Sequence, residues 1–428
     1  MTHRLASGLR NFARGLCIWI GLAGTALLRA DGLQPGDIVA ICGDSITRQA
    51  MYSAFIETYL LACQPIKAIH AHQFGVNSER SWDFLSRIDS EVLPFHPTVA
   101  TLFYGMNDGG YRPVDPERQA KYREATKETV RRLRRGGVRF IVVGSPGAVD
   151  SDTFDNNLIA PISAREYNEE TLAGLAKISR QVAAEEGIAY AEIHQTFRAT
   201  MARAKAEHGP AYHVAGADGV HPAPNGHLII AYAFLKALGC DGEIATIRVD
   251  FGQNRATATE GHRVLSVTAN AAEIESTRYP FCFYGKRGDP DGTRGIVDFL
   301  PFNSDLNRFR LVVSGASTGR LKVTWGKTSK IFSADELGRG INLAAEFLDN
   351  PFSEPFRVVM SAVRRKQELE TQGMRGAWQG AVRWLGPDQR SGVEKLPVGV
   401  LEKARAPEAE VRAAVKPVIH TLKIEPVP

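Results

Sequence analysis

Residues 37–47 read Asp-Ile-Val-Ala-Ile-Cys-Gly-Asp-Ser-Ile-Thr, and this stretch indicates the class of the fold. Its first six residues form a largely apolar run, which is typical of a strand buried on both faces of a parallel sheet. Over residues 46–63 the apolar side chains recur at the period of a helix, with Tyr52, Phe55, Ile56, Tyr59 and Leu60 on one stripe. A buried strand that leads into an amphipathic helix predicts an α/β fold.

The same alternation continues outward as far as Cys240. Further strands are predicted at 66–70, 98–104, 138–143 and 188–193, and helices at 79–93, 115–135, 163–186 and 224–238. Helices between successive buried strands predict a parallel sheet covered on both faces, which is a three-layer α/β/α architecture. In such sheets the reacting groups lie at the carboxyl ends of the strands.

After Cys240 the pattern changes to short alternating segments such as Arg320–Gly326, which predict a β-rich domain over residues 241–335. The remaining residues, 336–428, are predicted to be helical and irregular. Within them we expect helices at 339–370 and 407–416 and a last strand at 419–424. The expected organisation is therefore an N-terminal segment over 1–30, an α/β domain over 31–240, a β-rich domain over 241–335 and a C-terminal region over 336–428.

The N-terminal segment resembles a targeting signal. Residues 1–30 contain four Arg and no acid, and an apolar run spans 15–28, which is short for a membrane span and suits a signal peptide. We expect export to the periplasm or the medium, with a mature chain that starts near Asp31. Retention of the segment as a membrane anchor is the alternative, because Leu28 and Arg29 are unusual next to a cleavage site.

Charge and cysteine usage exclude several classes of protein. The chain has 52 Lys and Arg against 47 Asp and Glu, and its excess of positive charge lies mostly in residues 1–30, so nothing indicates a nucleic-acid partner. Beyond residue 30 there are four scattered cysteines without a Cys-x-x-Cys pair, and any disulfide pairing stays open. The histidines lack the carboxylate or cysteine spacing of a metal site, so no metal and no organic cofactor is expected.

Three short motifs follow predicted strands or precede the last helix of the α/β region. Ser45 follows the first strand, Asn107 follows the third, and Asp218 stands three residues before His221. Taken singly, Ser45 could be a helix cap and Asn107 part of an Asn-Asp-Gly turn. Together they supply a nucleophile, an amide donor for an oxyanion, a base and a carboxylate that orients the base.

These motifs resemble those of the GDSL or SGNH hydrolases over residues of about 31–240. Gly43-Asp44-Ser45-Ile46 is similar to the first block of the family with Ile in place of Leu, Gly105-Met-Asn107-Asp108 to the third, and Asp218-x-x-His221 to the fifth. The resemblance implies a flavodoxin-like fold, a catalytic triad of Ser45, Asp218 and His221, and an oxyanion hole that includes the N–H of Ser45 and the amide of Asn107.

In the second block, this chain departs from the family's pattern. Aligning residues 73–83 on Gly75 and on the acid Glu79 places Ser78 where the family has the glycine whose N–H completes the oxyanion hole. A backbone donor does not require glycine, so Ser78 is the expected third donor and Gly75 the fallback.

The expected function is that of an exported serine esterase acting on carbohydrate esters, with acetyl groups the simplest choice. A lysophospholipase or lipase is the first alternative, although the loop at 145–162 is largely polar where a lipase would carry an apolar lid. A binding protein on a hydrolase scaffold that has lost activity is the second, and Ser78 is the feature in its favour. The expected partner is a small-molecule or polysaccharide ester, and the oligomeric state stays open.

Overall fold

The computed structural model describes residues 32–154, 162–315, 319–371 and 406–427. The predicted signal peptide over residues 1–30 lies outside the described residues.

The first half of the chain folds around a five-stranded parallel sheet, which confirms the predicted α/β class. Its order is β2-β1-β3-β4-β5. The strands are β1 (Ile38–Gly43), β2 (His70–Gly75), β3 (Val99–Phe103), β4 (Phe140–Gly144) and β5 (Ala189–Ala191). Because all five strands run in the same direction, their carboxyl ends share one edge of the sheet.

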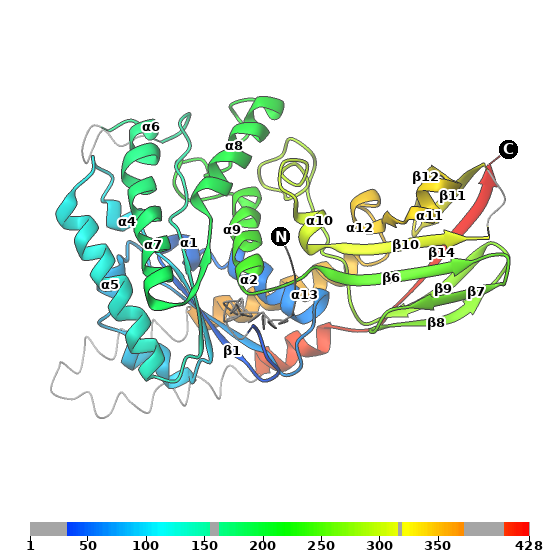
Figure 1. Cartoon of the computed structure of the whole chain (residues 1–428), viewed down its shortest axis with the longest axis horizontal. Coiled ribbons are helices and arrows are strands. Elements are labelled where there is room, and N and C mark those ends of the chain that lie inside the picture. Colours follow the sequence, from blue (N-terminus) through cyan, green and yellow to red (C-terminus); the bar gives the residue numbers. More distant parts are fainter. Residues whose placement is uncertain (1–31, 155–161, 316–318, 372–405, 428) are drawn as a thin grey trace, which may run out of the picture.

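Helices cover both faces of this sheet (Figure 1). One face packs against α2 (Tyr52–Thr58), α8 (His194–His208) and α9 (Pro224–Ala237). The other face packs against α3 (Ser81–Phe84), α5 (Pro116–Arg135) and α7 (Ala173–Glu186). The α/β part also contains shorter helical segments: α1 (Ser45–Arg48), α4 (Met106–Gly109), α6 (Ala164–Glu166), Tyr59–Cys63, Ile88–Val92, Leu93–Phe95 and Tyr167–Leu172.

The structure differs from the predicted elements in several places. Strand β2 starts at His70, where the predicted strand ends, because its buried residues His72 and Gln73 are polar and gave no apolar signal. The helix predicted over 46–63 is interrupted between Arg48 and Tyr52. Helix α8 was not predicted, because it buries only a few apolar side chains, among them Phe197 and Met201, within a polar sequence.

The second half of the chain forms two further sheets that extend away from the α/β part (Figure 1). One has the order β13-β10-β6-β7 and the other β12-β11-β14-β9-β8. Their strands are β6 (Glu243–Asp250), β7 (Arg255–Ala258), β8 (His262–Val267), β9 (Ala271–Ser276), β10 (Arg308–Ser314), β11 (Arg320–Trp325), β12 (Thr328–Ser333), β13 (Ile341–Asn342) and β14 (Val418–Val427). Strand β14, from the end of the chain, lies between β11 and β9, so the β-rich part is completed by residues far beyond 335.

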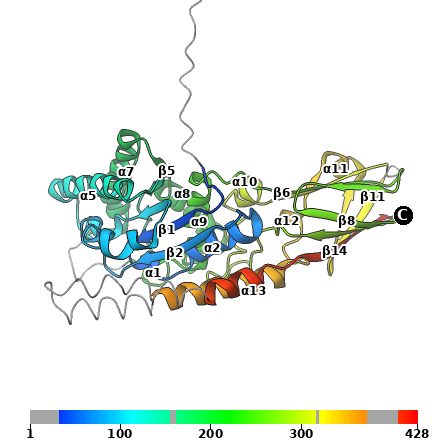
Figure 2. The ribbon, with the colours of Figure 1, turned by 90° about the horizontal axis from the view of Figure 1, so that it is seen from below.

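The helices of this half are α10 (Phe302–Leu306), α11 (Ala334–Arg339), α12 (Leu343–Glu346), α13 (Ser353–Leu369) and a helix over residues 406–414. Helix α13 returns to the α/β part and runs along α2 (Figure 2). Lys366 of α13 is fully buried and donates to Glu57 of α2 at 2.5 Å, and Gln367 donates to the same carboxylate at 2.7 Å. The C-terminal region is therefore joined to the α/β part by a buried ion pair.

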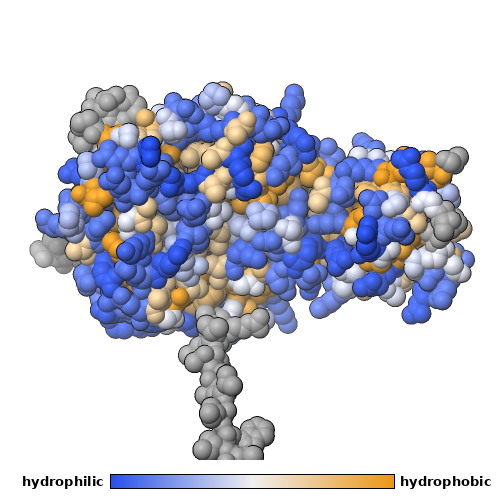
Figure 3. Space-filling model, turned by 45° about the horizontal axis from the view of Figure 1, so that its top comes forward, coloured by the Kyte–Doolittle hydropathy of each residue, from blue (hydrophilic) through white to orange (hydrophobic). Residues whose placement is uncertain are grey.

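Apolar residues occupy small separate areas on the face of the molecule shown in Figure 3, and hydrophilic residues cover most of it. Within the described residues, no helix combines the length and the apolar character needed to span a bilayer. The described cysteines Cys63, Cys240 and Cys282 are free thiols.

Candidate active site

Ser45 lies at the junction of β1 and α1, at the carboxyl edge of the parallel sheet. The carboxylate of Asp44 caps α1 by accepting the N–H of Ile46 at 2.9 Å. Gly43 must be glycine, because a Cβ there would lie 2.0 Å from Thr47 Oγ1. The tight junction places the Ser45 side chain in the first turn of α1, where the backbone N–H groups have no acceptor within the helix.

The structure brings Ser45 together with His221 and Asp218, although Ser45 lies more than 170 residues before both of them in the chain. Ser45 Oγ lies 2.8 Å from His221 Nε2, and His221 Nδ1 lies 2.6 Å from Asp218 Oδ2. The side chains of His221 and Asp218 are 38% and 55% exposed, so the site is open to solvent. Burial opposes the ionisation of Asp218, but hydrogen bonds from the N–H groups of His221 and Val220 and from the imidazole outweigh it and hold the pKa of this carboxyl below its usual value.

The loop that carries Asp218 is fixed by residues that the sequence did not indicate. The N–H of Asp150 donates to the carbonyl of Gly219 at 2.9 Å, and the hydroxyl of Thr153 donates to the carbonyl of Gly216 at 3.2 Å. Gly219 has a φ of +73°, and a Cβ there would lie 2.4 Å from the nitrogen of Phe154. The segment 150–154 thus holds the Asp-x-x-His loop in place.

Asn107 lies in α4, directly after β3, and its side-chain amide reaches the same edge. Its Nδ2 donates to the carbonyl of Glu79 at 3.2 Å and lies 3.4 Å from Asp44 Oδ2. The next residue, Asp108, is buried and accepts the N–H groups of Gly105 at 3.0 Å and of Ser81 at 2.9 Å. Asp108 therefore ties the loop after β3 to the loop after β2.

Ser78 has a φ of +58°, in the left-handed region that favours glycine. Its N–H makes no hydrogen bond with any part of the chain that the structure describes. The N–H of Gly75, the fallback donor, instead donates to the side chain of Gln73. The structure thus explains in physical terms why a glycine would suit position 78, and it leaves the N–H of Ser78 available.

Buried carboxyl groups surround this edge. Glu79 is paired with Arg87 at 2.5 Å and accepts the hydroxyl of Tyr104 at 2.8 Å. Burial, together with the nearby charges of Asp108 and Glu79, raises the pKa of Asp44 to about 8 against the lowering effect of the hydrogen bond from Ile46. Burial also raises the pKa of Asp108 to about 6. Burial therefore favours the neutral form of Asp44, which its role as a helix cap did not suggest from the sequence.

His227, the next histidine after His221, has a structural role. His227 is fully buried, and its Nδ1 accepts the N–H of Tyr52 at 3.3 Å while its Nε2 faces Gln49 Oε1 at 3.0 Å. It supports the break between α1 and α2. Among the residues described, no three His, Cys, Asp or Glu side chains lie close enough together to hold a metal ion.

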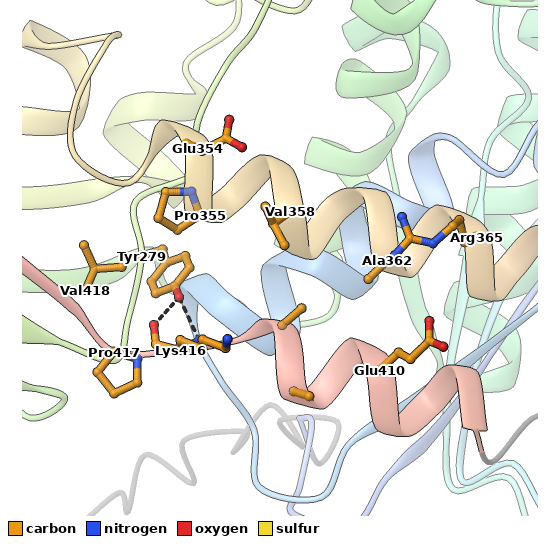
Figure 4. Close-up of a pocket in the computed structure, with 12 residues that line it drawn as sticks. Tyr279, Glu354, Pro355, Val358, Ala362, Arg365, Glu410, Lys416, Pro417 and Val418 are labelled. Carbon is orange, nitrogen blue, oxygen red and sulfur yellow. Dashed lines mark hydrogen bonds between the residues drawn. The ribbon is translucent and has the colours of Figure 1, made fainter.

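A separate groove of about 620 Å³ lies between α13 and the helix over 406–414 (Figure 4). Apolar side chains such as Val358 and Ala362 line it, and Tyr279 accepts the N–H of Lys416 at 3.0 Å at one end. It contains none of the predicted site residues.

Comparisons with known proteins concern the domain family and the fold. The sequence profile of the GDSL-like lipase/acylhydrolase family matches residues 41–229. A gut microbial diltiazem-metabolizing enzyme has a similar structure, with a TM-score of 0.70 at 20% identity over 92% of this chain and 98% of that one. An acetylxylan esterase from Geobacillus stearothermophilus is similar over 49% of this chain and 96% of that one, with 20% identity and a TM-score of 0.39.

No curated protein sequence matches the chain. At 20% identity the likeness to the diltiazem-metabolizing enzyme concerns the fold, and it extends through the α/β part and the two sheets that follow it. The profile match covers the end of β1, the Ser45 junction, Asn107 and the Asp-x-x-His loop. Residues 41–229 therefore match a GDSL-like lipase/acylhydrolase domain.

Proposed function

We propose that the protein is a serine esterase that hydrolyses carboxylic esters through an acyl-enzyme. The observation that carries this proposal is the continuous chain from Ser45 Oγ through the imidazole of His221 to the carboxylate of Asp218, at 2.8 and 2.6 Å, on the open edge of the sheet. These are the distances at which a base can take a hydroxyl proton and a carboxylate can fix the tautomer of that base.

In the first half of the reaction, His221 Nε2 takes the proton of Ser45 as Oγ attacks the ester carbonyl carbon. Asp218 accepts the Nδ1–H of His221 and stabilises the imidazolium. The tetrahedral intermediate collapses, His221 gives its proton to the leaving alcohol, and the acyl group stays on Ser45. In the second half, water attacks the acyl carbon with His221 as base, and Ser45 is released together with the acid.

The negative oxygen of each tetrahedral intermediate needs donors that are already in place. We assign the N–H groups of Ser45 and Ser78 and the amide of Asn107 to this role. The free N–H of Ser78 and the placement of Asn107 at the carboxyl edge of β3 support the assignment.

For the substrate class, we propose acetylated carbohydrates met outside the cytoplasm. The exposed side chains of His221 and Asp218 suit a bulky polar substrate, and the predicted signal peptide favours an exported enzyme. We further propose domain limits at residues 31–240 for the hydrolase and an accessory role for the sheets that follow. A lipase or lysophospholipase remains the second candidate within the same chemistry.

A fluorophosphonate probe tests the nucleophile. Mass spectrometry should find the adduct on Ser45 and none in Ser45→Ala, and the absence of any adduct would favour a binding protein on a hydrolase scaffold. Acetylated xylo-oligosaccharides compared with nitrophenyl esters of rising acyl length then test the substrate class. A kcat/KM that rises with acyl length would favour the lipase reading.

A further inference from the structure

Tyr111 follows α4 and has a backbone conformation that is rare for its type. Its φ is +54°, in the left-handed region that an aromatic residue seldom adopts. Such strain persists only where the surroundings hold it, and it is concentrated at functional sites. The contacts of Tyr111 show what holds it.

Both the backbone and the ring of Tyr111 are fixed by neighbouring aromatic residues. Its N–H donates to the hydroxyl oxygen of Tyr167 at 3.3 Å, and that hydroxyl donates to the carbonyl of Met106 at 2.7 Å. The ring stacks on Tyr167 at 5.6 Å between centroids and on Phe154 at 6.4 Å. Phe154 in turn lies against Gly219, so the ring of Tyr111 spans the space between the loop of Asn107 and the loop of Asp218.

The hydroxyl of Tyr111 donates to Asn107 Oδ1 at 3.4 Å. The other end of the same amide, Nδ2, donates to the carbonyl of Glu79. The two ends of an asparagine amide differ, since only the nitrogen can donate to an oxyanion. A half-turn of the amide would place Oδ1 against the carbonyl of Glu79, and the hydroxyl of Tyr111 would face the amide nitrogen in place of Oδ1.

We propose that Tyr111 is a positioning residue whose hydroxyl keeps the amide of Asn107 turned with its nitrogen toward the reacting oxygen. The inference rests on the proposed esterase function and extends its site by a residue outside the motifs. Tyr111 acts through Asn107, so its contribution exists only while that amide is present.

A double-mutant cycle tests this dependence. Tyr111→Phe keeps the ring and its stacking and removes the hydroxyl, so kcat should fall about three- to tenfold with KM unchanged, as expected for one lost hydrogen bond. Asn107→Ala should lower kcat about 10²- to 10³-fold. In the Asn107→Ala background, Tyr111→Phe should then cause no further loss.

Tyr190→Phe is the matched control, because it removes the hydroxyl of a half-buried tyrosine outside the proposed site, and it should leave kcat unchanged. The rate at which a fluorophosphonate labels Ser45 gives a second readout that needs no turnover.

Three results would overturn the inference: no loss in Tyr111→Phe, a rise in KM alone, or an equal loss in both backgrounds. Full turnover by Ser45→Ala would instead overturn the esterase function itself, so the two failures are distinguishable.

Discussion

Among the described residues, a serine hydroxyl contacts a histidine ring at two places, one at the edge of the parallel sheet and one between the sheets of the second half. At the edge, Ser45 Oγ lies 2.8 Å from His221. In the second half, Ser276 Oγ lies 2.8 Å from His262 Nδ1 and 2.9 Å from His420 Nε2. The same functional groups at the same distances therefore stand in two different environments.

The buried pair forms one directed chain of hydrogen bonds. The indole of Trp325, which can only donate, donates to His420 Nδ1 at 3.1 Å, and the carbonyl of Ile244, which can only accept, lies 2.9 Å from His262 Nε2. Hence His420 donates to Ser276, and Ser276 donates to His262. Both imidazoles are then neutral, and burial lowers the pKa of His420 to about 3 in agreement with that assignment.

The difference shows that a short distance between a serine and a histidine is not sufficient for catalysis. Behind His221 stands the carboxylate of Asp218, whereas an indole and a carbonyl stand behind the imidazoles of the buried chain. Ser276 is 0% exposed, so no substrate can reach it. We therefore propose that Ser45 is the reacting serine. The hydrogen bonds of Ser276 instead link the strands β6, β8, β9, β11 and β14.

The largest expected effect separates the two serines directly. Ser45→Ala should lower kcat by about 10⁴ or more, because it removes the nucleophile. Ser276→Ala should leave kcat unchanged under the same conditions. Steady-state hydrolysis of a nitrophenyl acetate by both variants measures the contrast, and wild-type turnover in Ser45→Ala would contradict the assignment.

A second expected effect concerns the charge next to Ser45. With a pKa of about 8, Asp44 is neutral below pH 8 and becomes negative above it, where its charge opposes the developing oxyanion. We expect kcat to fall about tenfold per pH unit above pH 8. Asp44→Asn stays neutral and can still cap α1, so its kcat should match the wild type at pH 7 and stay level at higher pH.

The pH profile of kcat for both proteins between pH 6 and pH 10 is the measurement. An identical alkaline fall in Asp44→Asn would assign the fall to another group.

The third expected effect is on stability. Ser276→Ala leaves the buried Nε2–H of His420 and Nδ1 of His262 without their partner, so the free energy of unfolding should drop by about 1–3 kcal/mol. Urea unfolding at pH 7, followed by fluorescence, measures it. Ser45→Ala, at a half-buried serine, serves as the control, and an equal loss there would remove the contrast between the two serines.

The smallest expected effect concerns Ser78. Glycine adopts the φ of +58° without strain, and a backbone donor does not need the side chain, so Ser78→Gly should keep kcat within about tenfold of the wild type. Asn107→Ala deletes a donor and provides the scale. A loss in Ser78→Gly as large as that in Asn107→Ala, with the fold intact, would mean that the hydroxyl itself acts.

The sequence indicated the strands of the parallel sheet well where they are apolar, as in β1, β3 and β4, and poorly where they are not. In β2 the buried polar side chains are matched by residues about 300 positions away: His72 meets Glu370 at 3.0 Å, and Gln73 meets Thr371 at 2.6 Å. The local sequence pattern does not indicate partners that lie so far away in the chain.

The α/β class and the motifs around Ser45, Asn107 and His221 follow from the sequence alone, because each is a short run whose periodicity or spacing is local. Only the tertiary structure decided which serine–histidine pair is open, which carboxyl is neutral and which way the amide of Asn107 is turned. Burial, pKa and side-chain orientation depend on atoms contributed by distant segments, such as Glu79 beside Asn107, and β14 between β9 and β11. Those contacts exist only after the chain has folded.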